Sequence, residues 1–185
     1  SYAASFGKES LSDNMAGLLK KALPEFNAIS VREKWGVLSL KSLGIDAIEV
    51  ADPVFLLEKK YWCGLSRYVK TPERFLLCYS LERDIRIDKE VQDQVKQKDI
   101  PAIIIHSTCE RIVVSDGAKY LYNIGPREFL YLILNAEVII TNSFHATAFS
   151  IILDKEVINI SSRKRMARAK NLLNGLHCSY LAEPE

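Results

Sequence analysis

Apolar and polar positions alternate along the chain in blocks of two kinds. Short, nearly continuous apolar runs are typical of strands buried in a parallel sheet, and apolar residues three or four positions apart are typical of helices packed on it. The runs predict strands at 28–31, 45–51, 75–80, 101–106, 138–140 and 157–160, with a shorter one at 112–114. The helical spacing predicts helices at 12–26, 34–43, 89–98, 125–136 and 165–176, and one that begins near residue 144. Because strands and helices alternate, the chain is predicted to be an α/β protein with a Rossmann-like parallel sheet and flanking helices.

The segment 54–74 is the least regular part of this pattern, and it contains an aromatic cluster. A segment of this length without clear periodicity is uncommon inside one compact α/β unit. We therefore expect it to connect two layers or two domains.

Composition excludes several classes of protein. The chain has 185 residues, 48% of them hydrophobic, and a net charge of +2, which is typical of a folded globular protein and indicates no particular partner. The four cysteines show neither CxxC spacing nor nearby histidine pairs, so neither a zinc site nor a disulfide scaffold is expected. No apolar run reaches the roughly 18 residues of a membrane span, and we expect a cytoplasmic protein. The opening at Ser1, directly in a strand-like segment, predicts a fragment of a longer protein.

The segment 137–153 holds the main candidate chemistry. A short apolar strand is followed by Thr141, Asn142 and Ser143, and then by a helix with His145 in its first turn. A helix start leaves backbone N–H groups available to an anion, and the carboxyl ends of parallel strands are where such sheets bind ligands. This arrangement favours chemistry on an anionic substrate. An equally good interpretation makes the three polar residues helix caps and His145 a packing residue.

Two further residues lie where predicted strands end. Arg32 follows the strand 28–31 and could bind a carboxylate or phosphate. Spacing alone favours a structural ion pair with Glu33 or another nearby acid. His106 ends the strand 101–106 and either lines the cleft or is simply a polar terminus. The basic run 163–170 could bind a phosphate, a lipid headgroup or an acidic glycan. The simpler interpretation is a solvated helix face. No GxGxxG or GxxxxGK[ST] motif occurs, which argues against a standard dinucleotide or P-loop site.

Three stretches in order carry a resemblance to a known family. They are ISVREK at 29–34, DPVFLL at 52–57, and AEVIITNSFH at 136–145, followed by Thr147, Phe149 and Ser150. Together they resemble the polysaccharide pyruvyl transferase family, and the resemblance extends over nearly the whole chain. Two features depart from the family pattern: its glycine-rich start is absent, and Ala146 stands where the family usually has glycine.

The resemblance implies a fold and a domain organisation. Members of the family look like GT-B glycosyltransferases, in which two Rossmann-like domains face each other across a cleft. By that analogy residues 1–57 match the end of an incomplete N-terminal domain, and residues 58–185 match the C-terminal domain that carries the SFH motif.

The resemblance also implies a reaction, the transfer of pyruvate from phosphoenolpyruvate to a sugar of a cell-surface polysaccharide, with formation of a ketal. His145 and Arg32 are then the expected catalytic residues, with His145 donating a proton or stabilising the leaving phosphate. The expected substrate-binding residues are Thr141, Asn142, Ser143, Ala146 and His106. No metal and no cofactor beyond this donor substrate is expected. The expected partners are phosphoenolpyruvate and a glycan or lipid-linked glycan, with no nucleic acid and at most peripheral membrane contact, at the inner face.

Two other functions fit the same sequence. A GT-B glycosyltransferase that uses a nucleotide sugar would share the fold, because fold does not determine function. A non-catalytic glycan-binding domain could have kept the fold, and Ala146 is compatible with it. Binding of a nucleotide diphosphate or of phosphoenolpyruvate would separate the enzymatic alternatives.

Overall fold

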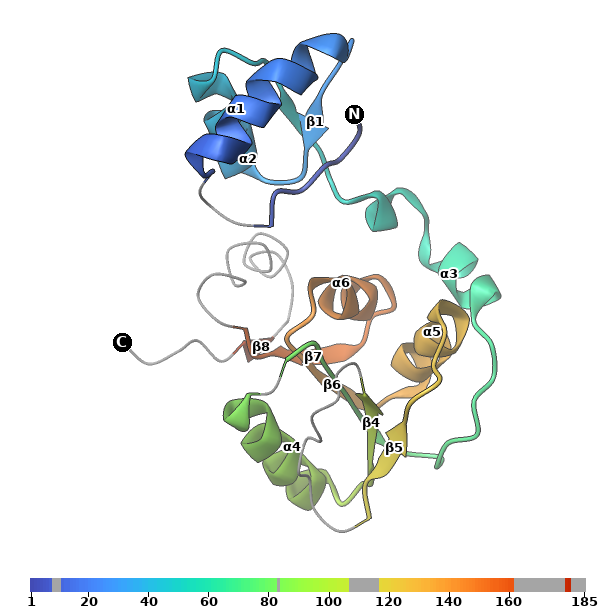
Figure 1. The fold of residues 1–185 in the computed structure, drawn as a ribbon. Coiled ribbons are helices and arrows are strands. Elements are labelled where there is room, and N and C mark those ends of the chain that lie inside the picture. Colours follow the sequence, from blue (N-terminus) through green and yellow to red (C-terminus); the bar gives the residue numbers. More distant parts are fainter. Residues whose placement is uncertain (8–10, 83, 107–116, 162–178, 181–185) are drawn as a thin grey trace. The chain divides into compact units, whose positions relative to one another are not determined.

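The computed structural model describes residues 1–7, 11–82, 84–106, 117–161 and 179–180 (Figure 1). The chain divides into two compact units, unit 1 from Ser1 to Leu56 and unit 2 from Leu57 to Glu185. The division lies one residue before the expected domain boundary between 57 and 58.

Unit 1 is built on a small parallel sheet. Strands β1 (Ser30–Val31) and β2 (Ile48–Glu49) pair in parallel, and Ala4 forms a parallel bridge with Val31. The helical elements are α1 (Asp13–Ala22), the 3-10 helix η1 (Leu23–Glu25), α2 (Lys34–Ser42) and the 3-10 helix η2 (Pro53–Leu56). The side chain of Ser12 caps α1, which begins within one residue of the predicted start; no residue of α1 is buried, and its apolar side is exposed or half-buried.

Unit 2 contains a six-stranded sheet in which every neighbouring pair is parallel, in the order β5-β4-β3-β6-β7-β8. The strands are β3 (Leu76–Ser80), β4 (Ala102–His106), β5 (Lys119–Leu121), β6 (Val138–Thr141), β7 (Glu156–Asn159) and β8 (Ser179–Tyr180). The central strands β3 and β6 are almost wholly buried, which explains why they are continuous apolar runs in the sequence.

Helices cover both faces of this sheet (Figure 1). They are α3 (Lys59–Leu65), α4 (Ile85–Lys98), α5 (Pro126–Asn135) and α6 (Phe144–Ile152). Alternate residues of β3 point to opposite faces: Leu76 and Cys78 join the core cluster under α4, and Leu77 joins the cluster that includes residues of α5. The predicted α/β fold with a Rossmann-like parallel sheet is confirmed.

Several elements differ from the sequence prediction. Helix α4 begins at Ile85 rather than near 89, because Asp84 caps it and accepts a hydrogen bond from the amide of Arg86 at 3.0 Å. Strand β5 is a half-buried strand at the edge of the sheet, without an apolar run that would predict it. Helix α3 lies in the segment expected to be irregular. The strand predicted at 112–114 and the basic helix predicted at 165–176 lie outside the described residues.

Candidate functional site

The chain passes from β6 into α6 through a two-residue turn at the carboxyl edge of the sheet of unit 2. All four residues of β6 are buried, and Asn142 and Ser143 complete the turn. Ser143 has extended backbone angles and caps α6, since its Oγ accepts a hydrogen bond from the amide of Ala146 at 3.4 Å. His145, the second residue of the helix, is exposed. The strand–turn–helix predicted from the sequence is therefore present, and it holds His145 at the surface.

Thr141 anchors the turn to the neighbouring strand β3. Its Oγ1 donates a hydrogen bond to the carbonyl of Tyr79 at 2.6 Å and accepts one from the amide of Ser143 at 3.0 Å. Thr141 has no solvent-exposed surface. Its hydroxyl thus makes both of its hydrogen bonds inside the protein, where it fixes the start of the turn.

Asn142 ties the turn to the loop that follows β3. Its Oδ1 accepts a hydrogen bond from the amide of Leu81 at 2.8 Å. Its Nδ2 donates to the Oγ of Ser80 at 3.0 Å and to the carbonyl of Glu82 at 3.2 Å. With these three bonds the buried side chain holds together two loops that are about 60 residues apart in the sequence.

A second set of buried hydrogen bonds supports the turn from β7. The Oγ1 of Thr147 donates to the carbonyl of Ser143 at 3.0 Å and accepts from the Nδ2 of Asn159 at 2.7 Å. The Oδ1 of Asn159 in turn accepts a hydrogen bond from Ser161 at 2.6 Å. Sequence reasoning did not single out Asn159; the available signal was a polar residue at the end of an apolar strand. The turn is thus held from the strands on both sides of β6.

Ala146, where the related family usually has glycine, is fully buried. It lies in the first turn of a right-handed helix, a conformation that any residue adopts. Its methyl group therefore contributes to the interior and does not protrude beside the exposed His145. The half-buried ring of Phe144 contacts His145 edge-on, with 5.3 Å between ring centroids.

His106 is the last residue of β4. In the register of the sheet its backbone lies opposite Ser80, the residue that accepts a hydrogen bond from Asn142. The backbone of His106 thus reaches the carboxyl edge of the sheet two strands away from β6, as the sequence predicts.

Arg32 belongs to unit 1, where it follows β1. It forms an ion pair with Asp52, whose carboxylate is buried and also accepts a hydrogen bond from the amide of Val54 at 3.1 Å. Glu33, the other acid considered from spacing, instead accepts a hydrogen bond from the hydroxyl of Ser5. The catalytic role expected for Arg32 stays a prediction, as does that of His145 in unit 2.

Two other features are absent from the described part of the chain. Among the described residues, no group of three or more His, Cys, Asp or Glu side chains is arranged to hold a metal ion. None of the helices described has the length and apolar character needed to cross a bilayer.

Comparison with solved structures identifies the fold. UDP-GlcNAc 2-epimerase of Methanocaldococcus jannaschii, solved with UDP-GlcNAc and UDP, is similar with a TM-score of 0.58 and 15% identity, over 84% of this chain and 50% of that one. MurG of Acinetobacter baumannii aligns with a TM-score of 0.49 and 10% identity, over 91% of this chain and 64% of that one. The chain thus spans about half the length of the epimerase, and this likeness shows a GT-B-like fold.

Comparison with known sequences identifies the family. No curated protein matches the chain significantly. The family model of the polysaccharide pyruvyl transferases matches residues 1–164, which include Arg32 and the complete turn from β6 to α6. Since this match covers most of the chain, the protein belongs to the polysaccharide pyruvyl transferase family.

Proposed function

We propose that this chain is part of an enzyme that transfers pyruvate from phosphoenolpyruvate to two hydroxyl groups of a polysaccharide sugar. The observation that carries the proposal is the family match over residues 1–164, which include the His145 turn. The acceptor we propose is a glycan or a lipid-linked glycan in the cytoplasm, at the inner face of the membrane.

The reaction needs a proton donor and a site for two anionic groups. The methylene carbon of phosphoenolpyruvate gains a proton, and the neighbouring carbon forms a bond to the first sugar hydroxyl. The bond from that carbon to the phosphate oxygen then breaks, and the second hydroxyl takes the vacant position. Of the two hydroxyl protons, one replaces the proton that the donor gave to the new methyl group. The other leaves with the phosphate. The products are a ketal and inorganic phosphate.

His145 is suited to the role of proton donor. Its side chain is exposed, while the backbone beneath it is held by the buried bonds of Thr141 and Thr147. Imidazole is the side chain that most often transfers protons near neutral pH. The start of α6 adds the partial positive charge of its backbone dipoles, which favours a phosphate or carboxylate nearby. Because its backbone is held in this way, His145 loses little backbone freedom when substrate binds.

Arg32 is our candidate for the second anionic group of the substrate. A guanidinium carries several donors in one plane, which suits the binding of a carboxylate or phosphate, and the pair with Asp52 orients it. We propose that Asp52 positions Arg32 and that Arg32 binds the carboxylate or phosphate of phosphoenolpyruvate. Thr141 and Asn142, whose bonds lie inside the protein, would then shape the site, and Ser143 would orient His145 or bind an anionic oxygen.

Donor binding can be tested on this chain by following histidine side-chain resonances in NMR titrations. A saturable shift of the His145 resonance with phosphoenolpyruvate, well above that with inorganic phosphate, is expected. The chain has three histidines, so loss of one resonance in His145→Ala assigns it. A stronger response to UDP would instead favour a nucleotide-sugar enzyme, and no response to any of the three in the complete protein would favour a non-catalytic domain.

Catalysis can be tested in the complete protein with the variant His145→Ala. Removal of an acid–base group typically lowers turnover by about 100-fold or more, and we expect a loss of that size in phosphate release from phosphoenolpyruvate. The control is Lys96→Ala on the exposed side of α4, which should keep normal turnover. Near-normal turnover of His145→Ala would remove this residue from the mechanism.

A further inference from the structure

We propose that the outer side of α3, the segment that follows it, the start of α5 and Lys119 of β5 form a docking surface for an anionic membrane. The proposal concerns residues other than those of the His145 turn and does not depend on the reaction proposed above. We call this region the α3 surface, and its residues are Tyr61, Leu65, Tyr68, Lys70, Lys119 and Arg127.

The apolar part of the α3 surface comes from the two-sided character of α3. On one side Trp62 packs inward, with its ring 4.9 Å from that of Phe149 between centroids. On the other side Tyr61 and Leu65, one helical turn apart, are 54% and 45% exposed, and Tyr68 is 71% exposed. Tyrosine has an apolar ring and a polar tip, and it is enriched where a bilayer meets water. The two tyrosines and Leu65 give the surface an apolar centre.

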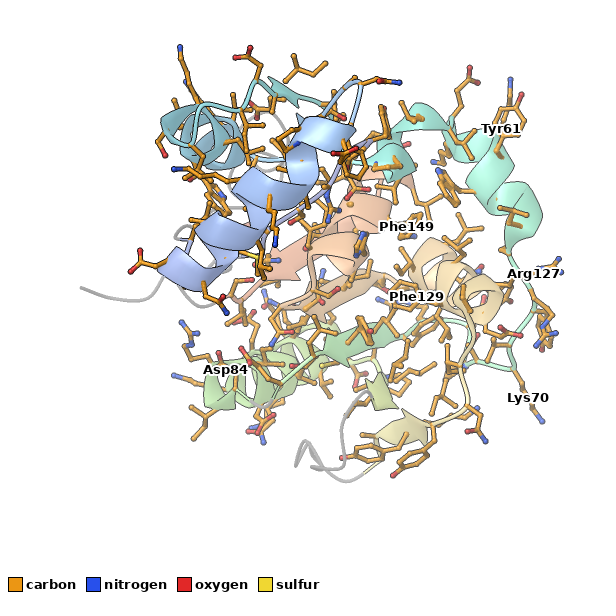
Figure 2. All side chains as sticks on the ribbon, turned by 45° about the horizontal axis from the view of Figure 1, so that its top comes forward. Tyr61, Lys70, Asp84, Arg127, Phe129 and Phe149 are labelled. Atoms are coloured by element: carbon orange, nitrogen blue, oxygen red, sulfur yellow. The ribbon has the colours of Figure 1, made fainter. Side chains whose placement is uncertain are left out.

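Cations surround this centre. Three of the four Lys or Arg in the segment 57–71 form ion pairs with carboxylates, so the unbalanced charge comes from Lys70, together with Lys119 and Arg127. The side chains of Arg127 and Lys119 donate hydrogen bonds to the backbone carbonyls of Leu65 and Lys70, both at 2.8 Å, which leaves their charge uncancelled. Among the described residues, no carboxylate pairs with Lys70, Lys119 or Arg127. Figure 2 shows Tyr61, Arg127 and Lys70 following one another along one side of unit 2.

The α3 surface is fixed before any partner arrives. The amide of Arg67 donates to the carbonyl of Arg127 at 3.0 Å, and its guanidinium pairs with the buried Glu128. The rings of Tyr68 and Tyr131 pack edge to face, with centroids 5.4 Å apart. Because these contacts attach the segment after α3 to α5, binding would cost little ordering of the backbone.

Exposed apolar side chains among uncancelled cations fit an anionic bilayer better than other partners. Each Lys or Arg near an anionic membrane strengthens binding by about fivefold, and the apolar groups add to this by entering the headgroup region. The combination therefore favours phospholipid headgroups of negative charge.

The test is co-sedimentation of the full chain with phospholipid vesicles. We expect binding to phosphatidylcholine vesicles that contain about 30 mol % phosphatidylglycerol, and much weaker binding to phosphatidylcholine alone. Binding should fall when the salt concentration rises to about 0.5 M, because the Debye length then shrinks below the distance between surface charges. Failure of the wild-type chain to bind the anionic vesicles would overturn the proposal.

Variants on two faces of unit 2 make the test specific. Lys70→Gln with Arg127→Gln should weaken binding by about 25-fold, and Tyr61→Ser with Leu65→Ser should weaken it at every lipid composition. Lys70→Glu alone, which keeps the hydrogen bond from Lys119 to the backbone carbonyl of residue 70, should also weaken binding if the double variant fails to fold. The control is Lys89→Gln with Lys96→Gln on α4, or Ile85→Ser, whose side chain is 80% exposed. An equal loss in the control variants would contradict the proposal.

Discussion

Cys78 lies in the middle of β3 without any solvent contact. Burial raises the pKa of its thiol to about 12, and the nearby carboxylate of Asp88 adds to the shift. Both effects disfavour the thiolate, which is the nucleophilic form. Cys63, by contrast, is half-buried at the inner side of α3.

We predict that iodoacetamide at pH 8 labels Cys63 in the native protein and leaves Cys78 unmodified until the protein is unfolded. Site-resolved mass spectrometry of the labelled peptides gives the answer, with labelling in urea as the control. Rapid native labelling of Cys78 would show that β3 is not buried as described.

The same residue should make stability depend on alkaline pH. Its pKa is raised in the folded protein, so above about pH 8.5 the unfolded chain releases this proton first and the free energy of unfolding falls as pH rises towards 12. The variant Cys78→Ala should lose this part of the pH dependence. Urea unfolding at several pH values measures it, and identical pH profiles for both proteins would contradict the assignment.

Single-residue roles were only partly predictable from the sequence. The cap position of Ser143 follows from its place before a helical pattern, and the structure confirms it. Spacing indicated an ion pair for Arg32 but not which acid would form it; the partner is Asp52, 20 residues away, because β1 and the segment after β2 lie side by side. Such pairs depend on how strands assemble, which local spacing does not contain.

At the scale of elements, α6 is attached to the sheet by polar contacts on both sides of β6. Asn142 bonds to the loop after β3, and Asn159 bonds to Thr147 from the end of β7. Buried hydrogen bonds of this kind cost more when one partner is missing than they contribute when both are present. The start of α6 therefore depends on three strands.

We predict that Asn159→Leu lowers the free energy of unfolding by about 1–3 kcal/mol, because it leaves Thr147 and Ser161 without their partner. Urea unfolding measures the loss. The matched control is Asn135→Leu, which removes an exposed hydrogen bond to the carbonyl of Tyr131 and should change stability by less than about 0.5 kcal/mol. Equal effects of the two variants would contradict a supporting role for Asn159.

Elements with strong apolar runs or caps were predictable, and the others were not. The strands β3, β4, β6 and β7 are apolar runs because they are buried on both faces. The edge strand β5 is half-exposed and carries Lys119, so its pairing with β4 leaves no apolar signature in the sequence. The start of α1 was placed within one residue, whereas α4 begins with the exposed Ile85 and was placed four residues late.

At the scale of the whole molecule, the two units differ in how much apolar surface they bury. Both large core clusters consist of residues from 62 onwards and lie in unit 2. In unit 1 the buried apolar residues among those described are Ala3, Val31 and Leu40. A chain of about 60 residues is marginal even with a good core, so unit 1 has little stability of its own.

We predict that residues 57–185 expressed alone unfold cooperatively with heat and keep the far-UV circular dichroism of an α/β protein. Residues 1–56 alone should show no cooperative transition. Calorimetry of the two fragments and of the full chain measures this. A non-cooperative 57–185 fragment would mean that its core needs the preceding residues.

The position of β3 in the sheet has a consequence for folding kinetics. It is the first strand of its sheet along the chain, yet it lies between β4 and β6, and its contacts with β6 join residues 62 positions apart. During synthesis on the ribosome, β3 and β4 can pair before β6 has been made. The edge of β3 that later pairs with β6 stays unpaired until then. Long-range pairing of this kind is slow. The turn that presents His145, which requires β3, β6 and β7 together, is accordingly among the last features of unit 2 to form.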